Sequence, residues 1–303
     1  MRSVVRSGNN SSYRRLLLLC VLALSASGAS YASTINLGDT EQTRFEQIYL
    51  TLESASENTR RRRISVVEAP VDPAVFTRLR RVKSNGRESF SNATLIAGGD
   101  CYWIASTAGH SVLDQRFSRL ANRADIEVEL PDGSWVNPEE IAASPRLSWN
   151  SDEIDDWALL VLRAPRCQFN DTHRFASTLP YLPTQPLDRQ VLDQCRRDVQ
   201  FMCYHFDQGV SKGQRMLEEN CELLSIERTE GHTGYASCKV DYGVSGCSPV
   251  CIRGDVWINL GVFSKGLKRH ASDTFPQPVA GFRVMDGEIA DVLRELKRKY
   301  KLN

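Results

Sequence analysis

Several features that would place this protein in common functional classes are missing from its sequence. Its 303 residues include only five histidines, and 38 Lys and Arg nearly balance 37 Asp and Glu. There is no Cys-x2-Cys pair and no histidine pair at metal-ligand spacing, so we expect no bound metal. A chain so close to neutral also argues against general nucleic-acid binding.

Long apolar runs are scarce as well, and no stretch is long enough to span a bilayer. The run Leu16–Leu24 has nine residues (24 − 16 + 1) and follows four arginines, and Ser30-Tyr31-Ala32 supplies small residues for cleavage. We expect residues 1–32 to be a secretory signal peptide, which makes the mature protein secreted or periplasmic without stable membrane insertion. An uncleaved N-terminal anchor is the alternative. The mature chain would carry 34 basic (38 − 4) and 37 acidic residues.

Cysteine is present in an even number once the signal peptide is set aside. An even count behind an export signal predicts up to four disulfides, and the spacing leaves their connectivity open. The eight residues are Cys101, Cys167, Cys195, Cys203, Cys221, Cys238, Cys247 and Cys251.

The stretch Gly243-Val244-Ser245-Gly246 places a serine between two glycines. Glycine reaches backbone angles that let a turn present the serine hydroxyl outward, with backbone N–H groups directed at one point. Nucleophilic attack on a carbonyl needs this geometry, because N–H donors must wait where negative charge develops. A plain Gly/Ser-rich hairpin turn is the alternative interpretation.

A serine nucleophile needs a base, and the base needs a residue to orient it. His110 follows a strand-like run, Ala93–Ala97, and a series of small residues. Asp156 opens the apolar run Trp157–Leu162, where a buried carboxylate requires a hydrogen-bond partner. The neighbouring Asp155 is expected to be solvated. The remaining histidines are interpreted as surface or core residues: His173, His205, His232 and His270.

Three blocks together resemble the signatures of chymotrypsin/trypsin-like serine proteases, in that family's order. They are Thr107-Ala108-Gly109-His110, Asp156-Trp157-Ala158-Leu159 and Gly243-Val244-Ser245-Gly246, with catalytic positions 46 (156 − 110) and 89 (245 − 156) residues apart. The resemblance covers roughly residues 64–297. It implies a nucleophile at Ser245, a general base at His110, an orienting Asp156 and an oxyanion hole from Gly243 and Ser245. It requires no cofactor.

The resemblance implies an all-β fold of two six-stranded antiparallel β-barrels of the chymotrypsin type. A C-terminal α-helix and a short N-terminal helical extension would complete it. The expected divisions are residues 1–32 (signal), 33–63 (extension or propeptide), 64–163 (first barrel), 164–187 (connection), 188–270 (second barrel) and 271–303 (C-terminal segment).

Apolar patterns give the expected elements within these divisions. Short runs bounded by Gly, Asn, Asp or Pro predict strands at Phe76–Val82, Thr94–Ile96, Ile126–Leu130, Ala158–Leu162 and Val256–Phe263. Helical spacing predicts a helix over residues 39–54 and another after Asp286. The second has an apolar stripe of Ile289, Val292, Leu293 and Leu296, and the resemblance has it packed on the second barrel.

The resemblance also suggests how a peptide or protein substrate is held. Ser264-Lys265-Gly266 matches the segment that pairs with substrate backbone, and Lys239 falls at the base of the specificity pocket, where it would favour an acidic side chain. A lysine pointing to solvent is the alternative. The sequence leaves the oligomeric state open.

The run Arg60–Arg63 resembles a zymogen cleavage site, and a solvated linker is the alternative. In family members activated by cleavage, an aspartate before the catalytic serine pairs with the new N-terminus. Val244 stands here, so Ser245 should be organised without that ion pair. The resemblance also pairs Cys251 with either Cys195 or Cys203.

Two other functions remain as alternatives. An exported, catalytically inactive protease homologue that binds proteins would usually lack one of the three catalytic residues. A secreted esterase of the α/β-hydrolase type would need the opposite chain order, Ser then Asp then His, and alternating helices.

Overall fold

A computed structural model describes residues 60–63, 75–83, 85–114, 119–148, 151, 154–164, 167, 182, 184, 191, 194–196, 198–206, 214–227, 233–238, 243–253, 256–267, 279–285 and 287–302. The predicted signal peptide, the helix expected over 39–54, Lys239 and Asp286 lie outside these residues. The division of the chain into the six expected segments therefore stays a prediction.

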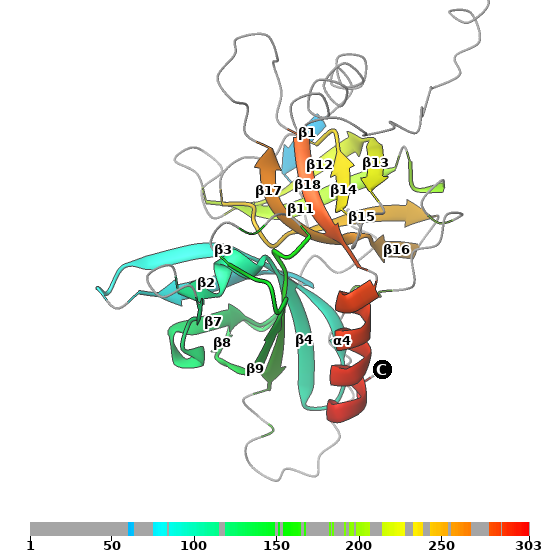
Figure 1. Ribbon diagram of the computed structural model, residues 1–303. Helices are drawn as coiled ribbons and strands as arrows, with labels where there is room; N and C mark the ends of the chain where they lie inside the picture. The colour runs from blue at the N-terminus through cyan, green and yellow to red at the C-terminus, as the bar shows by residue number, and fades with distance from the viewer. Residues whose placement is uncertain are drawn as a thin grey trace, which may run out of the picture. The chain divides into compact units, whose positions relative to one another are not determined.

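One antiparallel sheet of seven strands is formed by residues 76–163, in the order β8-β7-β2-β3-β4-β10-β9 (Figure 1). Its strands are β2 (Phe76–Val82), β3 (Glu88–Gly98), β4 (Tyr102–Thr107), β7 (Ile126–Glu129), β8 (Trp135–Val136), β9 (Pro138–Ala143) and β10 (Ala158–Arg163). A two-stranded ribbon of β5 (Leu113–Asp114) and β6 (Arg119–Leu120) lies between β4 and β7 in the chain.

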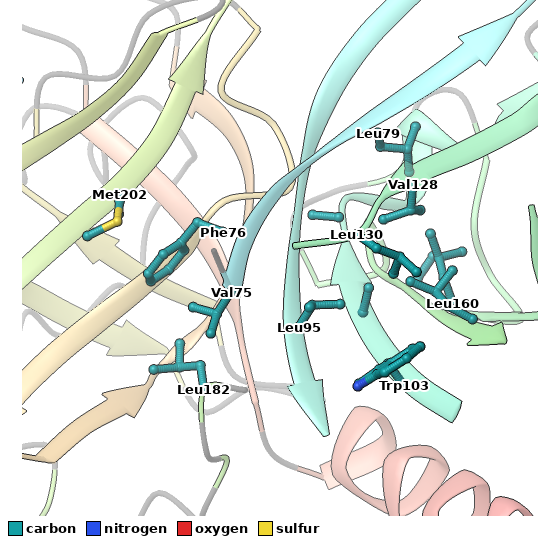
Figure 2. Close-up of a cluster of buried hydrophobic side chains, with 14 of the residues drawn as sticks. Val75, Phe76, Leu79, Leu95, Trp103, Val128, Leu130, Leu160, Leu182 and Met202 are labelled. Atoms are coloured by element: carbon teal, nitrogen blue, oxygen red, sulfur yellow. The ribbon is translucent and has the colours of Figure 1, made fainter. Parts of the chain in front are cut away.

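Strand β10, which lies between β4 and β9, shows why this sheet needs apolar residues on both faces. Successive side chains of a strand point to opposite faces. Leu160 and Leu162 belong to one core cluster, whereas Leu159 and Val161 belong to another. Figure 2 shows the first cluster, which runs from Leu160 and Trp103 of the sheet to Met202 of a strand far along the chain.

The remaining strands form two further antiparallel sheets. The first has the order β1-β12-β11-β15-β16: β1 (Arg60–Arg63), β12 (Gln214–Cys221), β11 (Val199–His205), β15 (Ser248–Arg253) and β16 (Val256–Asn259). The second has the order β13-β14-β18-β17: β13 (Leu223–Glu227), β14 (Thr233–Ala236), β18 (Val279–Val284) and β17 (Gly261–Leu267). The expected all-β fold with a C-terminal helix is confirmed, although the strands group as sheets of seven, five and four.

The strand predicted over Val256–Phe263 is broken at Leu260. A Cβ on Gly261 would lie 2.1 Å from the Arg283 carbonyl oxygen, so only glycine fits there. The side chain of Asn259 accepts a hydrogen bond from the Gly261 N–H at 2.9 Å. This bend sends the chain from the sheet of β16 into the sheet of β17.

Helix α4 (Gly287–Tyr300) carries the predicted apolar stripe, and its buried residues are Ile289, Leu293 and Leu296. These side chains cluster mainly with residues of β3, β4 and β10, which belong to the seven-stranded sheet, and α4 runs alongside β4 in Figure 1. The expectation that the helix packs on the second barrel is therefore wrong. Leu159 and Val161 of β10, together with Ile104 of β4, present a second apolar face, and α4 covers it. No helix among the described residues is long and apolar enough to cross a membrane.

All eight cysteines after the predicted signal form disulfides. They join Cys101 to Cys167, Cys195 to Cys251, Cys203 to Cys247 and Cys221 to Cys238. Of the two partners suggested for Cys251, Cys195 is the one used, because Cys203 bonds to the cysteine two residues after Ser245. These two bridges lie in the core cluster that also contains Val244.

The arginine run forms an edge strand. All four residues of β1 pair with β12, from Arg60 opposite Glu219 to Arg63 opposite Met216. For these four residues, the expectation of a linker is therefore wrong, because they form a strand of the sheet. Strand pairing satisfies backbone groups of the run and covers the outer edge of β12.

Candidate active site

His110 lies in a short 3-10 helix, Gly109–Ser111, directly after β4. The turn is possible because residue 109 is glycine. A Cβ there would lie 2.5 Å from Cδ1 of Leu147 and 3.0 Å from the backbone nitrogen of Trp157. The absence of a side chain at Gly109 therefore lets the histidine segment pack against the chain next to Asp156.

Two hydrogen bonds join His110 to Asp156. The backbone N–H of His110 donates to Asp156 Oδ1 at 2.7 Å, and His110 Nδ1 lies 2.7 Å from Asp156 Oδ2. The Asp156 side chain is only 5% exposed, whereas the His110 side chain is 32% exposed. The carboxylate is thus enclosed, while the imidazole can still meet a ligand.

A hydroxyl from β17 completes the surroundings of Asp156. The buried side chain of Ser264 donates to Asp156 Oδ2 at 2.5 Å, across 108 residues of chain. This bond joins the sheet that carries Ser264 to the loop that carries Asp156. Of the residues expected to hold substrate, Ser264 therefore has its hydroxyl on the carboxylate.

The pKa of Asp156 lies below its ordinary value. Burial acts to raise the pKa, but the His110 ring, the Ser264 hydroxyl and the His110 N–H all stabilise the charged form and outweigh burial. Asp156 is thus an anion at neutral pH, and it can fix the His110 tautomer that carries a proton on Nδ1.

Ser245 lies in a turn whose shape depends on glycine. Gly243 and Gly246 have φ angles of 85° and 87°, in the left-handed region. A Cβ on Gly246 would lie 2.0 Å from the Asn92 carbonyl oxygen. Gly246 N–H donates to the Phe263 carbonyl at 2.9 Å, which fixes the turn to β17, the strand that carries Ser264.

The turn is also fixed to β3, the neighbour of the strand that leads to His110. The backbone N–H of Asn92 donates to the Ser245 carbonyl at 2.8 Å, and Thr107 Oγ1 donates to the Asn92 carbonyl at 2.7 Å. Thr107 is the last residue of β4, three positions before His110. Within the described residues, the N–H groups of Gly243 and Ser245 have no acceptor.

The predicted site residues are brought together to different degrees. His110 and Ser264 both form hydrogen bonds to Asp156. Ser245 is linked to the strand that leads to His110 through Asn92, which bonds both to the Ser245 carbonyl and to Thr107. No hydrogen bond joins the Ser245 hydroxyl to His110 among the described residues. Lys265 and Gly266 belong to β17, opposite Gly281 and Ala280. Lys239 lies outside the described residues.

Sequence reasoning missed one residue, Asn92. It is 2% exposed in β3, directly before the small and apolar run Ala93–Gly98. A buried amide always needs partners, and this was the available signal. The partners themselves, Tyr204 and Gly243, lie more than 100 positions away, at separations of 112 and 151 residues.

Asp155 is not solvated as expected. Its side chain is 16% exposed and accepts hydrogen bonds from Ser144 Oγ and Arg146 Nε, both at 2.9 Å. The same arginine approaches Glu288 of α4 at 3.8 Å.

Among the described residues, no group of three or more His, Cys, Asp or Glu side chains could hold a metal ion.

Comparisons with known proteins agree with this architecture. No protein-family model matches the chain, and no curated protein matches it. Among solved structures, 660 chains are similar, including the crystal structure of a thermostable serine protease, AL20, from an extremophilic microorganism. That protein is 15% identical with a TM-score of 0.52, and the match covers 73% of this chain and 95% of that one. The chain therefore has a chymotrypsin-like all-β fold.

Proposed function

We propose that the protein is an exported serine endopeptidase that hydrolyses peptide bonds through an acyl-enzyme on Ser245. The observation that carries the proposal is the enclosed His110–Asp156 pair, held by Ser264, beside a turn that presents a serine between two left-handed glycines. The serine protease among the structural neighbours supports the same chemistry.

In the proposed reaction, Ser245 Oγ attacks the carbonyl carbon of the peptide bond. His110 Nε2 takes the hydroxyl proton and then gives it to the leaving amine, and a water molecule repeats the sequence to release the acyl group. Asp156 keeps the Nδ1 proton in place and stabilises the imidazolium. Its lowered pKa supports this role, because the carboxylate stays charged at neutral pH.

The oxyanion formed in the attack needs hydrogen-bond donors at fixed positions. The backbone N–H groups of Gly243 and Ser245 are the proposed donors, and neither has an acceptor among the described residues. Loss of one such donor typically lowers the rate by about 100-fold or more.

The substrate would be a protein or peptide. The segment Ser264–Gly266 is proposed to pair with substrate backbone, and Lys239 to favour an acidic side chain. Val244 is 1% exposed in an apolar cluster, which supports an active turn that needs no ion pair to a new N-terminus. Export would follow from the signal peptide predicted at residues 1–32.

A fluorophosphonate probe tests this proposal, because it forms a covalent bond only with an activated serine. The mature protein is expected to be labelled, and Ser245→Ala to abolish the labelling. Ser134→Ala is the matched control. Ser134 lies in a turn, and its hydroxyl bonds only to Asp132 among the described residues. This control should be labelled like the wild type.

Labelling that survives Ser245→Ala would show that another residue is the nucleophile. A wild-type protein that is folded but never labelled would favour the inactive, protein-binding homologue. If the wild-type protein is labelled, cleavage of a peptide library would identify which substrate side chain it prefers next to the cleaved bond.

A further inference from the structure

Asn92 forms several hydrogen bonds with the Gly243–Gly246 turn, and no motif in the sequence indicated them. Its side-chain Nδ2 donates to the Gly243 carbonyl at 2.9 Å and to the Tyr204 carbonyl at 3.0 Å. Its Oδ1 accepts the Tyr204 N–H at 2.6 Å. The amide of a single side chain thus joins the end of β11 to the first residue of the serine turn.

The backbone of Asn92 extends this connection. Its N–H donates to the Ser245 carbonyl and its carbonyl accepts the Thr107 hydroxyl. Asn92 therefore fixes two carbonyls of the turn, those of Gly243 and Ser245, and the peptide that contains the Ser245 N–H lies between them. A peptide between two fixed neighbours has little freedom to rotate.

Packing around the turn leaves little room for another arrangement. Gly246 lies directly against the Asn92 carbonyl, and a Cβ on Gly243 would lie 2.9 Å from Cβ of Phe206. The ring of Phe206 stacks on Phe90 of β3 at 5.5 Å. Asn92 thus supplies buried polar contacts in a close-packed junction between β3, β11 and the turn.

We propose that Asn92 is a positioning residue that holds the Gly243–Gly246 turn in the shape required for oxyanion stabilisation. The proposal rests on the proposed function of Ser245. Asn92 acts through the turn and touches no reacting atom.

The chemistry of the site requires an amide. Nδ2 must donate to two carbonyls while Oδ1 accepts an N–H, and no other side chain of this length offers both groups. A carboxylate at this position would face two carbonyl oxygens with no proton to donate. The isosteric change Asn92→Asp therefore removes the function with almost no change in volume.

Steady-state kinetics on a peptide substrate test the proposal. Asn92→Asp is expected to lower kcat by about 10-fold to 100-fold, because a misplaced oxyanion donor weakens transition-state binding, while KM changes by less than about threefold. Rates are to be expressed per fluorophosphonate-titrated site, so that unfolded protein does not count. Asn92→Ala should give a similar loss.

Asn137→Ala is the matched control. Its Nδ2 also donates to backbone carbonyls, those of Arg123, Ala124 and Ile126, but within the seven-stranded sheet and its turns. This variant is expected to lose stability and to keep the wild-type kcat per titrated site.

Hydrogen exchange provides a readout independent of activity. The Gly246 N–H, bonded to Phe263, should exchange faster in Asn92→Asp than in the wild type, because the turn opens more often. Wild-type kcat per site together with unchanged Gly246 exchange in both Asn92 variants would overturn the proposal. A wild-type protein without labelling would defeat the proposed function, and Gly246 exchange would still decide whether Asn92 holds the turn.

Discussion

Asp155 and Asp156 are neighbours in the chain, yet their carboxylates accept hydrogen bonds from two separate sets of residues. Asp156 accepts hydrogen bonds from His110 and Ser264, whereas Asp155 accepts them from Ser144 and Arg146. Asp155 lies in a turn directly before Asp156, and each of these two acids has hydrogen-bond donors of its own. Asp155 thus anchors the peptide that presents Asp156 to the imidazole.

The pH dependence of stability should report the environment of Asp156. The pKa of Asp156 in the folded protein is below its ordinary value of about 4. The stabilisation of the folded state by the charged carboxylate is therefore fully present above about pH 4. The contribution is lost as pH falls through the lower, folded pKa. We expect Asp156→Asn to be less stable than the wild type by about 1–3 kcal/mol at neutral pH. Denaturant unfolding from pH 7 to about pH 3 should show this difference shrinking at the acidic end. A gap that stayed constant would contradict the assignment.

Gly246 should tolerate no side chain. Gly246→Ala adds a Cβ 2.0 Å from the Asn92 carbonyl oxygen at a φ of 87°, so it combines a clash with backbone strain. We expect a loss of roughly 3–5 kcal/mol in the free energy of unfolding. Gly133→Ala separates the two effects, because its φ is 83° and nothing lies within 4 Å of its added Cβ. The control should lose only about 1 kcal/mol. Equal losses in the two variants would show that the close approach has no energetic weight.

The end of α4 should respond to alkaline pH. Burial and a hydrogen bond from the Tyr300 hydroxyl to Glu140 at 2.6 Å raise the pKa of Tyr300 to about 12. The neutral phenol is favoured in the folded state, so the stabilisation is present below about pH 10 and is lost as pH rises through 12. An ultraviolet titration should show one late-ionising tyrosine in the wild type that is missing in Tyr300→Phe. A variant with the same late ionisation would place that proton on another residue.

The arginine strand should resist proteolysis. A protease must accommodate an extended and unpaired backbone, and Arg60–Arg63 is paired with β12 along its whole length. We expect an arginine-specific protease to cut after Arg60 and Arg63 more slowly in the wild type than in Arg62→Pro. Proline removes an N–H and weakens strand pairing. Mass spectrometry of the fragments with time gives the two rates. Identical rates would mean that the pairing gives the strand no protection.

Much of the site could be predicted from local sequence because its chemistry depends on local residue types. The blocks around His110, Asp156 and Ser245 each combine a functional side chain with the small or apolar residues that its turn or strand needs. The strand Phe76–Val82 was predicted with the bounds observed, because it alternates between buried and more exposed residues. The bend at Leu260 was missed, because it depends on the approach of Gly261 to Arg283 from a later strand.

By itself, the sequence determined which residue types were available, their order along the chain and the all-β class, since these follow from short-range patterns. Only the tertiary structure decided that Ser264 bonds to Asp156, that Asn92 holds the serine turn and that α4 covers the seven-stranded sheet. Each of these contacts joins residues 100 or more positions apart or chooses between two apolar faces. Contacts of these kinds leave no periodic signal in the sequence, because the position of each partner depends on how whole sheets pack.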